Sequence, residues 1–153
     1  MNATLLNRAN ILAFAVPATL MAGALTSQYV GGLHPCEMCM WQRWPHEVAI
    51  ALAILAFFLH PPARSILIAL AGVAIVFSGA IGVFHAGVEY GWWEGLTTCS
   101  TTGGGGLADI MKAPLVRCDV PQWTFGGVSL AGFNALFSIL GGLAILALVR
   151  RAT

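Results

Sequence analysis

The sequence predicts an all-α membrane protein, built as an antiparallel four-helix transmembrane bundle. Apolar residues make up 58% of the 153-residue chain and charged residues only 8%, which leaves too few polar groups to cover a soluble globule. The mean hydropathy of +0.83 also indicates that lipid serves as solvent for much of the surface. Four apolar segments, at about 11–29, 44–59, 66–85 and 128–149, approach the roughly 20 residues that a membrane-spanning helix needs. One membrane domain, residues 1–153, accounts for the chain.

The first segment, 11–29, is expected to stay in the mature protein as a span. Arg8 followed by an apolar run, with Ala22-Gly23-Ala24 near its end, also resembles a cleaved signal peptide. The run extends over about 19 residues, however, whereas the apolar region of a signal peptide has roughly 7–15. Pro17 lies inside this segment, where membrane helices tolerate proline, and we expect it to mark a kink.

The second segment has the weakest pattern, because its unbroken apolar run covers only Val48 to Leu59. Pro45, His46 and Glu47 precede this run, so the span is expected to be short or tilted. It ends at His60-Pro61-Pro62, which cannot continue a helix and makes a tight connection to the third segment. The second and third helices are therefore expected to be antiparallel neighbours. Glycines are expected to let the helices approach closely: Gly72, Gly79, Gly82, Gly132 and Gly141.

The distribution of charge predicts the orientation in the membrane. One side of the bundle carries arginines and no carboxylate: Arg8, Arg64, Arg150 and Arg151. The other side carries all six acids, together with Arg43, Lys112 and Arg117: Glu37, Glu47, Glu89, Glu94, Asp109 and Asp119. The positive-inside rule then places both termini in the cytoplasm. The outer loops, about 30–43 and 86–127, hold all four cysteines on the oxidising side, where disulfides persist in bacteria.

The second outer loop is the main extramembrane stretch. After a polar run and the glycines 103–106, apolar residues recur at helical spacing beside Asp109 and Lys112, which predicts a short interfacial helix: Leu107, Ile110, Met111 and Leu115. Pro114 keeps this helix short, and Trp92, Trp93 and Trp123 are placed as interfacial anchors. The sequence has no internal repeat, phosphate-binding glycine motif or basic patch, so we expect no nucleotide or nucleic-acid binding.

The motif Pro35-Cys36-Glu37-Met38-Cys39 indicates redox chemistry. Pro35 suits the first turn of a helix, which places Cys36 at the helix N-terminus, where the helix dipole stabilises a thiolate. In a helix, Cys36, Cys39 and Arg43 occupy positions i, i+3 and i+7 on one face. A permanent cation at Arg43 would lower a thiolate pKa and could bind the carbonyl of an electron acceptor, although an arginine here could also extend to the lipid headgroups.

Two other uses of the four cysteines remain open at this point. A tetrahedral zinc site is disfavoured because Cys99 and Cys118 are separated by 18 residues that include four glycines, whereas closed zinc sites use tight pairs; we expect no metal. Permanent structural disulfides are disfavoured because a bridge between Cys36 and Cys39 would close too small a loop to constrain the unfolded chain.

Several motifs together resemble the DsbB family of bacterial inner membranes. They are Pro35-Cys36-Glu37-Met38-Cys39 followed by Trp41-Gln42-Arg43, then His85-Ala86-Gly87-Val88-Glu89 leading through Trp92-Trp93 to Cys99, and finally Cys118-Asp119 leading to Pro121-Gln122-Trp123. The resemblance covers essentially the whole chain. It implies a quinone reductase that reoxidises a soluble periplasmic thiol oxidase similar to DsbA.

The resemblance also implies a role for each site residue. Cys99 would be attacked by the partner's thiolate, and Cys118 would resolve that mixed disulfide. Electrons would pass to Cys36 and Cys39, with Cys39 facing the quinone. Arg43 would stabilise the Cys39 thiolate and the reduced quinone. His85 and Glu89 could line the same pocket, although His85 could instead be an interfacial or capping residue and Glu89 could be solvated.

The resemblance further implies ubiquinone as the cofactor, with menaquinone as the alternative, and no sequence feature offers a flavin, haem or nicotinamide site. We expect a monomer. Two departures from the family are visible: the interval between Cys99 and Cys118 is short and rich in glycine, and Glu37 replaces an apolar residue, which would oppose thiolate formation at Cys36. The alternatives are an enzyme similar to vitamin K epoxide reductase and a non-enzymatic protein with structural disulfides. The first is disfavoured because Cys-x-x-Cys lies between the first two spans.

Overall fold

A computed structural model of the chain describes residues 2–96, 100–101 and 115–153. Cys99 lies outside this part of the chain, as does most of the stretch where we expected an interfacial helix. Leu115, which we had assigned to the apolar pattern of that helix, begins a short strand instead.

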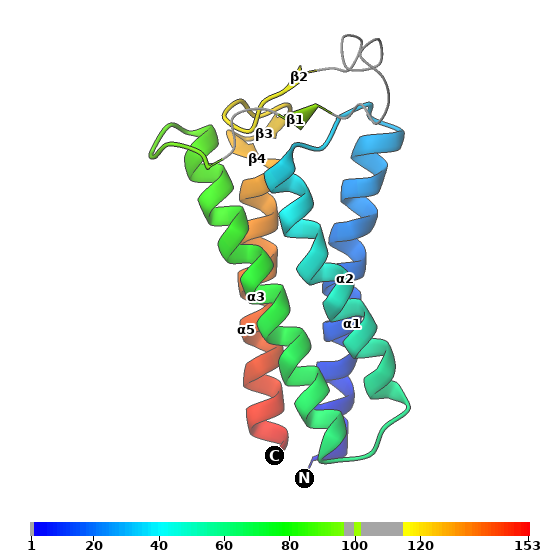
Figure 1. The fold of residues 1–153 in the computed structure, drawn as a ribbon. Coiled ribbons are helices and arrows are strands. Elements are labelled where there is room, and N and C mark those ends of the chain that lie inside the picture. The colour runs from blue at the N-terminus through cyan, green and yellow to red at the C-terminus, as the bar shows by residue number, and fades with distance from the viewer. Residues whose placement is uncertain (1, 97–99, 102–114) are drawn as a thin grey trace.

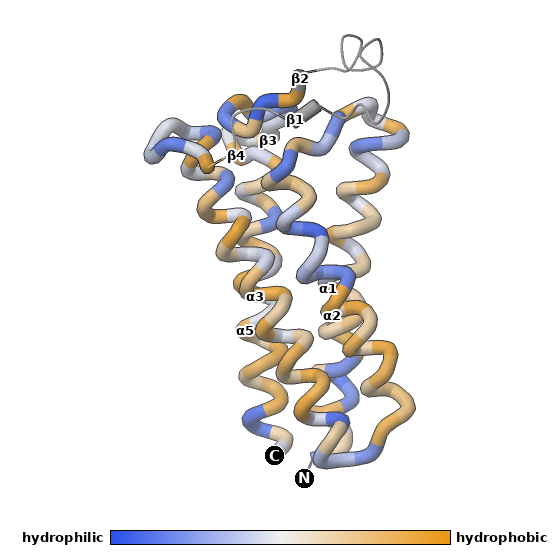
Figure 2. Tube along the Cα trace, viewed as in Figure 1, coloured by the Kyte–Doolittle hydropathy of each residue, from blue (hydrophilic) through white to orange (hydrophobic). Residues whose placement is uncertain are grey.

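Four helices make up most of the described chain: α1 (Ala3–Tyr29), α2 (Glu37–Phe57), α3 (Ala63–Glu89) and α5 (Leu130–Ala152). They run side by side, and both termini lie at the same end (Figure 1). Helix α3 packs against α2 and α5, and α1 packs against the same two helices from the other side. In the described part of the chain, α1, α3 and α5 are long and apolar enough to cross a membrane. Apolar positions dominate their length (Figure 2).

Helix α2 differs from the span that we expected at 44–59. It begins at Glu37, because Cys36 caps the first turn, and it continues through Pro45. Glu47, which we placed just before the apolar run and on the outer side, lies near the middle of α2 at an exposed position. With Glu37, Arg43 and Glu47 in one helix, α2 lacks the uniformly apolar stretch of the other three.

The other helix boundaries extend beyond the apolar segments. Helix α1 starts at Ala3 because the Asn2 side chain caps it, accepting a hydrogen bond from Leu5 N at 3.2 Å. The predicted break after α2 is confirmed, since α2 ends at Phe57 and α3 begins at Ala63, directly after Pro61 and Pro62.

Glycines allow α3 and α5 to approach closely, as predicted. A Cβ atom at Gly82 would lie 2.9 Å from Ala135 N, and one at Gly79 would lie 2.7 Å from Ile139 Cγ1. Gly141 of α5 likewise leaves room for the side chain of Val16 of α1, which an added Cβ atom would meet. Such backbone proximity is typical of helix packing in membranes.

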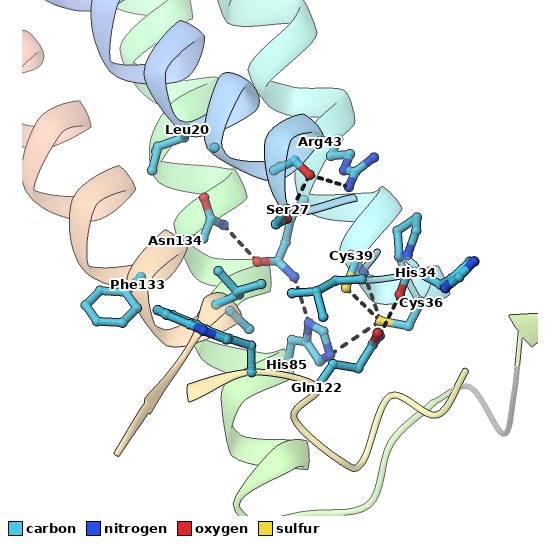
Figure 3. Close-up of a pocket in the computed structure, with 18 of the residues that line it drawn as sticks. Leu20, Ser27, His34, Cys36, Cys39, Arg43, His85, Gln122, Phe133 and Asn134 are labelled. Carbon is cyan, nitrogen blue, oxygen red and sulfur yellow. Dashed lines mark hydrogen bonds between the residues drawn. The ribbon is translucent and has the colours of Figure 1, made fainter. Parts of the chain in front are cut away.

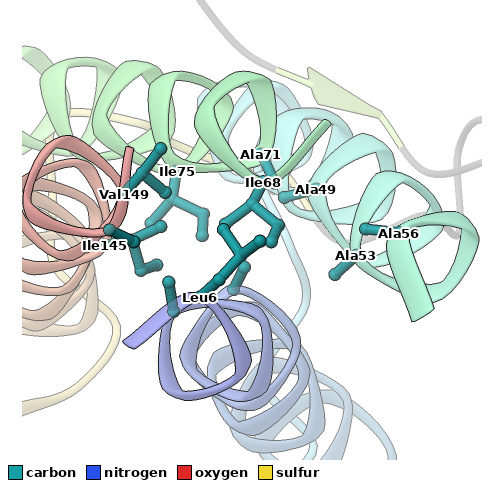
Figure 4. Close-up of a cluster of buried hydrophobic side chains, with 12 residues drawn as sticks. Leu6, Ala49, Ala53, Ala56, Ile68, Ala71, Ile75, Ile145 and Val149 are labelled. Carbon is teal, nitrogen blue, oxygen red and sulfur yellow. The ribbon is translucent and has the colours of Figure 1, made fainter. Parts of the chain in front are cut away.

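The apolar core lies toward the end that carries the termini. All four helices contribute to it, mostly with small or branched side chains (Figure 4): Leu6, Ala9, Ala13, Ala49, Ala53, Ala56, Ile68, Ala71, Ile75, Ile145, Val149 and Ala152. Most of the buried polar side chains lie in the other half of the bundle: Gln42, His46, Ser78, His85, Ser129 and Ser138.

Short strands cover that other end (Figure 1). Strand β1 (Ser100–Thr101) pairs with β2 (Leu115–Val116), and β3 (Thr124–Phe125) pairs with β4 (Val128–Ser129), both antiparallel. Gly126 and Gly127 form the β3–β4 turn with φ values of +59° and +80°, the left-handed conformation that two-residue hairpins require. Val128 and Ser129, which we assigned to the last span, belong to this hairpin.

Candidate active site

Cys36 occupies the N-cap position of α2. Its backbone is extended, and its Sγ accepts a hydrogen bond from Cys39 N at 3.3 Å, which satisfies one of the free N–H groups of the first turn. Cys36 is only 2% exposed. One helical turn brings the Cys39 sulfur to 2.9 Å from the Cys36 sulfur. The predicted thiol pair is thus a close contact between two side chains of one turn.

The two thiols, which precede the apolar part of α2, have opposite pKa shifts. The pKa of Cys39 is lowered, chiefly because the Cys36 thiol donates a hydrogen bond to its sulfur, with Arg43 as a smaller contribution. The pKa of Cys36 is raised by the same hydrogen bond and by burial. The reduced pair therefore carries its negative charge on Cys39 and its proton on Cys36.

We expect Cys39 in the reduced protein to be alkylated at a pH below the ordinary thiol pKa of 9.0, because its thiolate persists down to the lowered value. In Cys36→Ala the hydrogen-bond donor is lost, so the midpoint of the rate profile should rise. Arg43 and Glu89 also face Cys39 and shift its pKa in opposite directions, but neither is altered in this variant. Peptide mass spectrometry across a pH series measures the midpoint. The same midpoint in both proteins would contradict this assignment of charge.

Cys118 lies beside the pair although it comes from the second outer loop. It is 2% exposed and packs in one cluster with Cys36, Met38, Val88 and Val116. The sulfurs of Cys36 and Cys118 and a ring nitrogen of His85 all lie within 4.8 Å of one another. The fold thus brings one member of each predicted cysteine pair together.

A cavity of about 220 Å³ lies next to these sulfurs, between the four helices and beneath the segment 117–123 (Figure 3). Cys36, Cys39, Arg43, His85 and Glu89 all line it. Most of the remaining lining is apolar, which is typical of small-molecule sites with a few orienting polar groups.

Arg43 reaches from α2 to α1. Its Nη1 donates to Gln28 Oε1 at 2.7 Å and its Nη2 to Ala24 O at 3.4 Å. The guanidinium is therefore held at the cavity wall, and it is not extended toward lipid headgroups. Because an arginine has five N–H donors, these contacts leave the group able to bind an oxygen inside the cavity.

His85 and Glu89 lie at the end of α3, one turn apart. His85 Nε2 is 3.5 Å from Cys36 Sγ and 3.8 Å from Glu89 Oε1. Their side chains are 3% and 7% exposed, respectively. The alternative that Glu89 is solvated is therefore wrong, and the His85 ring points into the site.

Sequence reasoning missed a set of buried polar side chains at the wall of the cavity and behind it. They form a hydrogen-bonded network that reaches His85: Gln42, His46, Ser78, Asn134 and Ser138. A usable signal was present, because Asn134 is a polar residue within an otherwise apolar helix, and such residues in membrane helices mark functional positions.

Long apolar helices that hold a close thiol pair beside a third buried cysteine define a membrane protein built for thiol–disulfide exchange. Residues 6–149 match the family described as "Disulfide bond formation protein DsbB". The chain belongs to this family, which implies disulfide oxidoreductase activity.

Curated relatives agree with this assignment. The chain is 34% identical to "Disulfide bond formation protein B" of Methylococcus capsulatus, over 89% of this chain and 90% of the relative. It is 31% identical to the protein of that name from Chromohalobacter salexigens, over 92% of each chain. The protein of that name from Marinobacter nauticus is 30% identical, over 92% of this chain and 90% of its own length. No solved structure gives a significant match.

Proposed function

We propose that the protein is a quinone-dependent thiol–disulfide oxidoreductase that reoxidises a periplasmic DsbA-like dithiol oxidase. The observation that carries this proposal is the placement of Cys118, Cys36 and Cys39 in one group next to a cavity that Arg43 also lines. A relay from loop to membrane needs such a group, because thiol–disulfide exchange requires direct contact between sulfurs.

The proposal includes a location in the bacterial inner membrane. Helix α2 would span the membrane together with α1, α3 and α5, and the protein would act as a monomer. Arg8, Arg64, Arg150 and Arg151 favour cytoplasmic termini. The cysteines, which belong to the opposite end of the bundle, would then face the periplasm.

The exchange steps can be written so that electrons balance. The partner's thiolate attacks the Cys99–Cys118 disulfide at Cys99, and Cys118 leaves as a thiolate. Cys118 then attacks Cys36 of the Cys36–Cys39 disulfide, and the electron pair of the broken bond leaves on Cys39. The lowered pKa of Cys39 makes it the better leaving group of the two. The partner's second thiol, and not Cys118 as the resemblance implied, then resolves the mixed disulfide. It releases Cys99, which attacks Cys118 and frees Cys36.

The cavity fits the head group of a quinone in chemistry and in scale. Ubiquinone is the favoured acceptor, with menaquinone as the alternative; a bound quinone would accept two electrons and two protons. At about 220 Å³ the cavity is smaller than the roughly 300–1,000 Å³ of sites for drug-sized ligands, so a single ring suits it. Cys39 would supply electrons at one wall, and Arg43 would hold a carbonyl oxygen and stabilise its developing negative charge.

The proposed function is tested by anaerobic mixing of the purified protein, a reduced DsbA-like partner and ubiquinone. We expect the quinone absorbance to fall while the partner becomes oxidised in equal amount. Permanent structural disulfides would leave both unchanged and would overturn the proposal.

Arg43→Ala is expected to slow quinone reduction in this assay and to raise the KM for quinone by about tenfold, the scale of one hydrogen bond from a charged group. Formation of the mixed disulfide with the partner should persist, because Arg43 lies at the cavity and not at the docking loop. Arg43→Lys, which keeps the charge but loses the planar fork, should fall between the two proteins. An unchanged KM in Arg43→Ala would contradict the role of this residue.

A further inference from the structure

A chain of hydrogen bonds connects helix α5 to the sulfur of Cys36. Asn134 Nδ2 donates to Gln42 Oε1 at 2.8 Å, Gln42 Nε2 lies 2.8 Å from His85 Nδ1, and His85 Nε2 lies 3.5 Å from Cys36 Sγ. Figure 3 shows this path from Asn134 to Cys36. Gln42 is 6% exposed and His85 is 2% exposed, so these contacts are shielded from bulk water.

Backbone carbonyls fix the direction of the chain. Gln42 Nε2 lies 3.1 Å from Met38 O, and a carbonyl only accepts, so this atom must be the NH₂ group of the amide. Its second N–H is directed at His85 Nδ1. Nδ1 therefore has to accept, which it does only without a proton.

Asn134 holds the Gln42 amide in this orientation. Its Nδ2 lies 3.2 Å from Ser78 O, which again identifies a donor, and the same group donates to Gln42 Oε1. Reversing the Gln42 amide would set its oxygen against Met38 O and its NH₂ against the Asn134 donor. Both contacts would be unfavourable in a buried site, where unmatched polar groups cost about 1–3 kcal/mol each.

A neutral imidazole that accepts at Nδ1 carries its proton on Nε2. We propose that Asn134 and Gln42 are positioning residues that lock His85 in this tautomer, so that His85 donates a hydrogen bond to the sulfur of Cys36 and stabilises it during disulfide exchange. Glu89 Oε1, at 3.8 Å, and the backbone of Cys118 are the other groups that face the ring. The proposal rests on the proposed function only in that Cys36 takes part in exchange.

The tautomer decides which chemistry His85 supports. When Cys99 attacks a Cys118–Cys36 disulfide, the bond between Cys118 and Cys36 breaks and the electron pair leaves on Cys36, where the Nε2 proton stabilises it. The same proton occupies the lone pair that a metal would need. Cys36, His85 and Cys118 are close enough to surround a cation. A protonated Nε2 disfavours metal binding there and leaves the group to thiol–disulfide exchange.

The tautomer is measured directly by ¹⁵N NMR of the reduced, histidine-labelled protein in detergent. The signals of His85 are those absent from a His85→Asn variant. We expect an unprotonated Nδ1 and a protonated Nε2. A proton on Nδ1 in the unaltered protein would overturn the proposal, whether or not Gln42 or Asn134 can be replaced.

Gln42→Met tests the lock, since methionine fills a similar volume and offers no strong hydrogen bond. We expect the His85 signals to move to a mixture of tautomers. The irreversible alkylation of Cys36 by iodoacetamide, compared with and without the substitution in a Cys39→Ala background, should slow about tenfold, the scale of one hydrogen bond to a charged group. Asn134→Leu should act in the same direction. Unchanged tautomer and unchanged Cys36 reactivity in Gln42→Met would overturn the proposal.

Ser138→Ala is the matched control. The Ser138 hydroxyl donates to Asn134 Oδ1 at 2.9 Å and does not contact the Nδ2 group that holds Gln42. The His85 tautomer should therefore remain as in the unaltered protein. None of these measurements uses a quinone or a partner protein, so failure of the proposed function and failure of this inference would be seen separately.

Discussion

Replacing Cys39 with alanine is expected to abolish quinone reduction by the protein, with a loss of at least about a thousandfold, because removing a group that acts in series leaves no second route. Cys39 has the lowered pKa and lines the cavity together with Arg43. Without Cys39, Cys36 has no disulfide to exchange, so the reaction with the partner should stop after one turnover, with Cys99 and Cys118 reduced and no sulfur to pass their electrons onward. The measurement is the rate of quinone bleaching with reduced partner under anaerobic conditions.

Cys99→Ser provides the contrasting result. This variant should lose the mixed disulfide with the partner, while its Cys36–Cys39 pair, once reduced with dithiothreitol, should still bleach quinone. Bleaching by Cys39→Ala at the rate of the unaltered protein would end the proposed route. Trapping of the partner on a cysteine other than Cys99 would refute the order of the relay.

Gly82→Ala is expected to lower the free energy of unfolding by about 2 kcal/mol, the scale of overpacking in a close-packed interior. The added Cβ would lie 2.9 Å from Ala135 N and 3.0 Å from Ala131 O. Both atoms belong to the backbone of α5 and cannot move aside as a flexible side chain would, so α3 and α5 must separate. Unfolding in detergent, followed by circular dichroism, measures the effect.

Gly23→Ala is the matched control for this prediction. A Cβ at Gly23 would meet nothing within 4 Å, and alanine is favoured over glycine in a helix by up to about 1 kcal/mol. This variant should therefore be as stable as the unaltered protein or slightly more stable. Equal stability of the two variants would show that the contact between α3 and α5 tolerates separation.

The helices were predictable from local patterns. The break at Pro61 and Pro62, the cap at Cys36 and the close approach at Gly82 each follow from the preferences of a residue and its near neighbours. The full extent of α2 was less predictable than its start, because its polar first half, including Glu47, does not look like a membrane segment. In the structure the cap at Cys36 and the packing of α2 against α1 and α3 extend the helix through these residues.

The site was predictable only in part. The spacing of Cys36, Cys39 and Arg43 places them on one helix face, which needs no tertiary information. The contact of Cys118 with Cys36 and the path from Asn134 through Gln42 to His85 join positions as far as 92 residues apart. No periodicity encodes such contacts, and a family pattern centred on cysteines does not draw attention to amides.

Cys36 and Cys118 are each only 2% exposed beneath the outer loop, and this burial limits which thiols can react with them. Glutathione and other dissolved thiols have little direct access to these two sulfurs, so in the proposed reaction few electrons would enter the relay without passing through the partner. In the proposed reaction, the segment that covers these sulfurs would exclude dissolved thiols, and the selectivity of the oxidising pathway for its partner would depend on it.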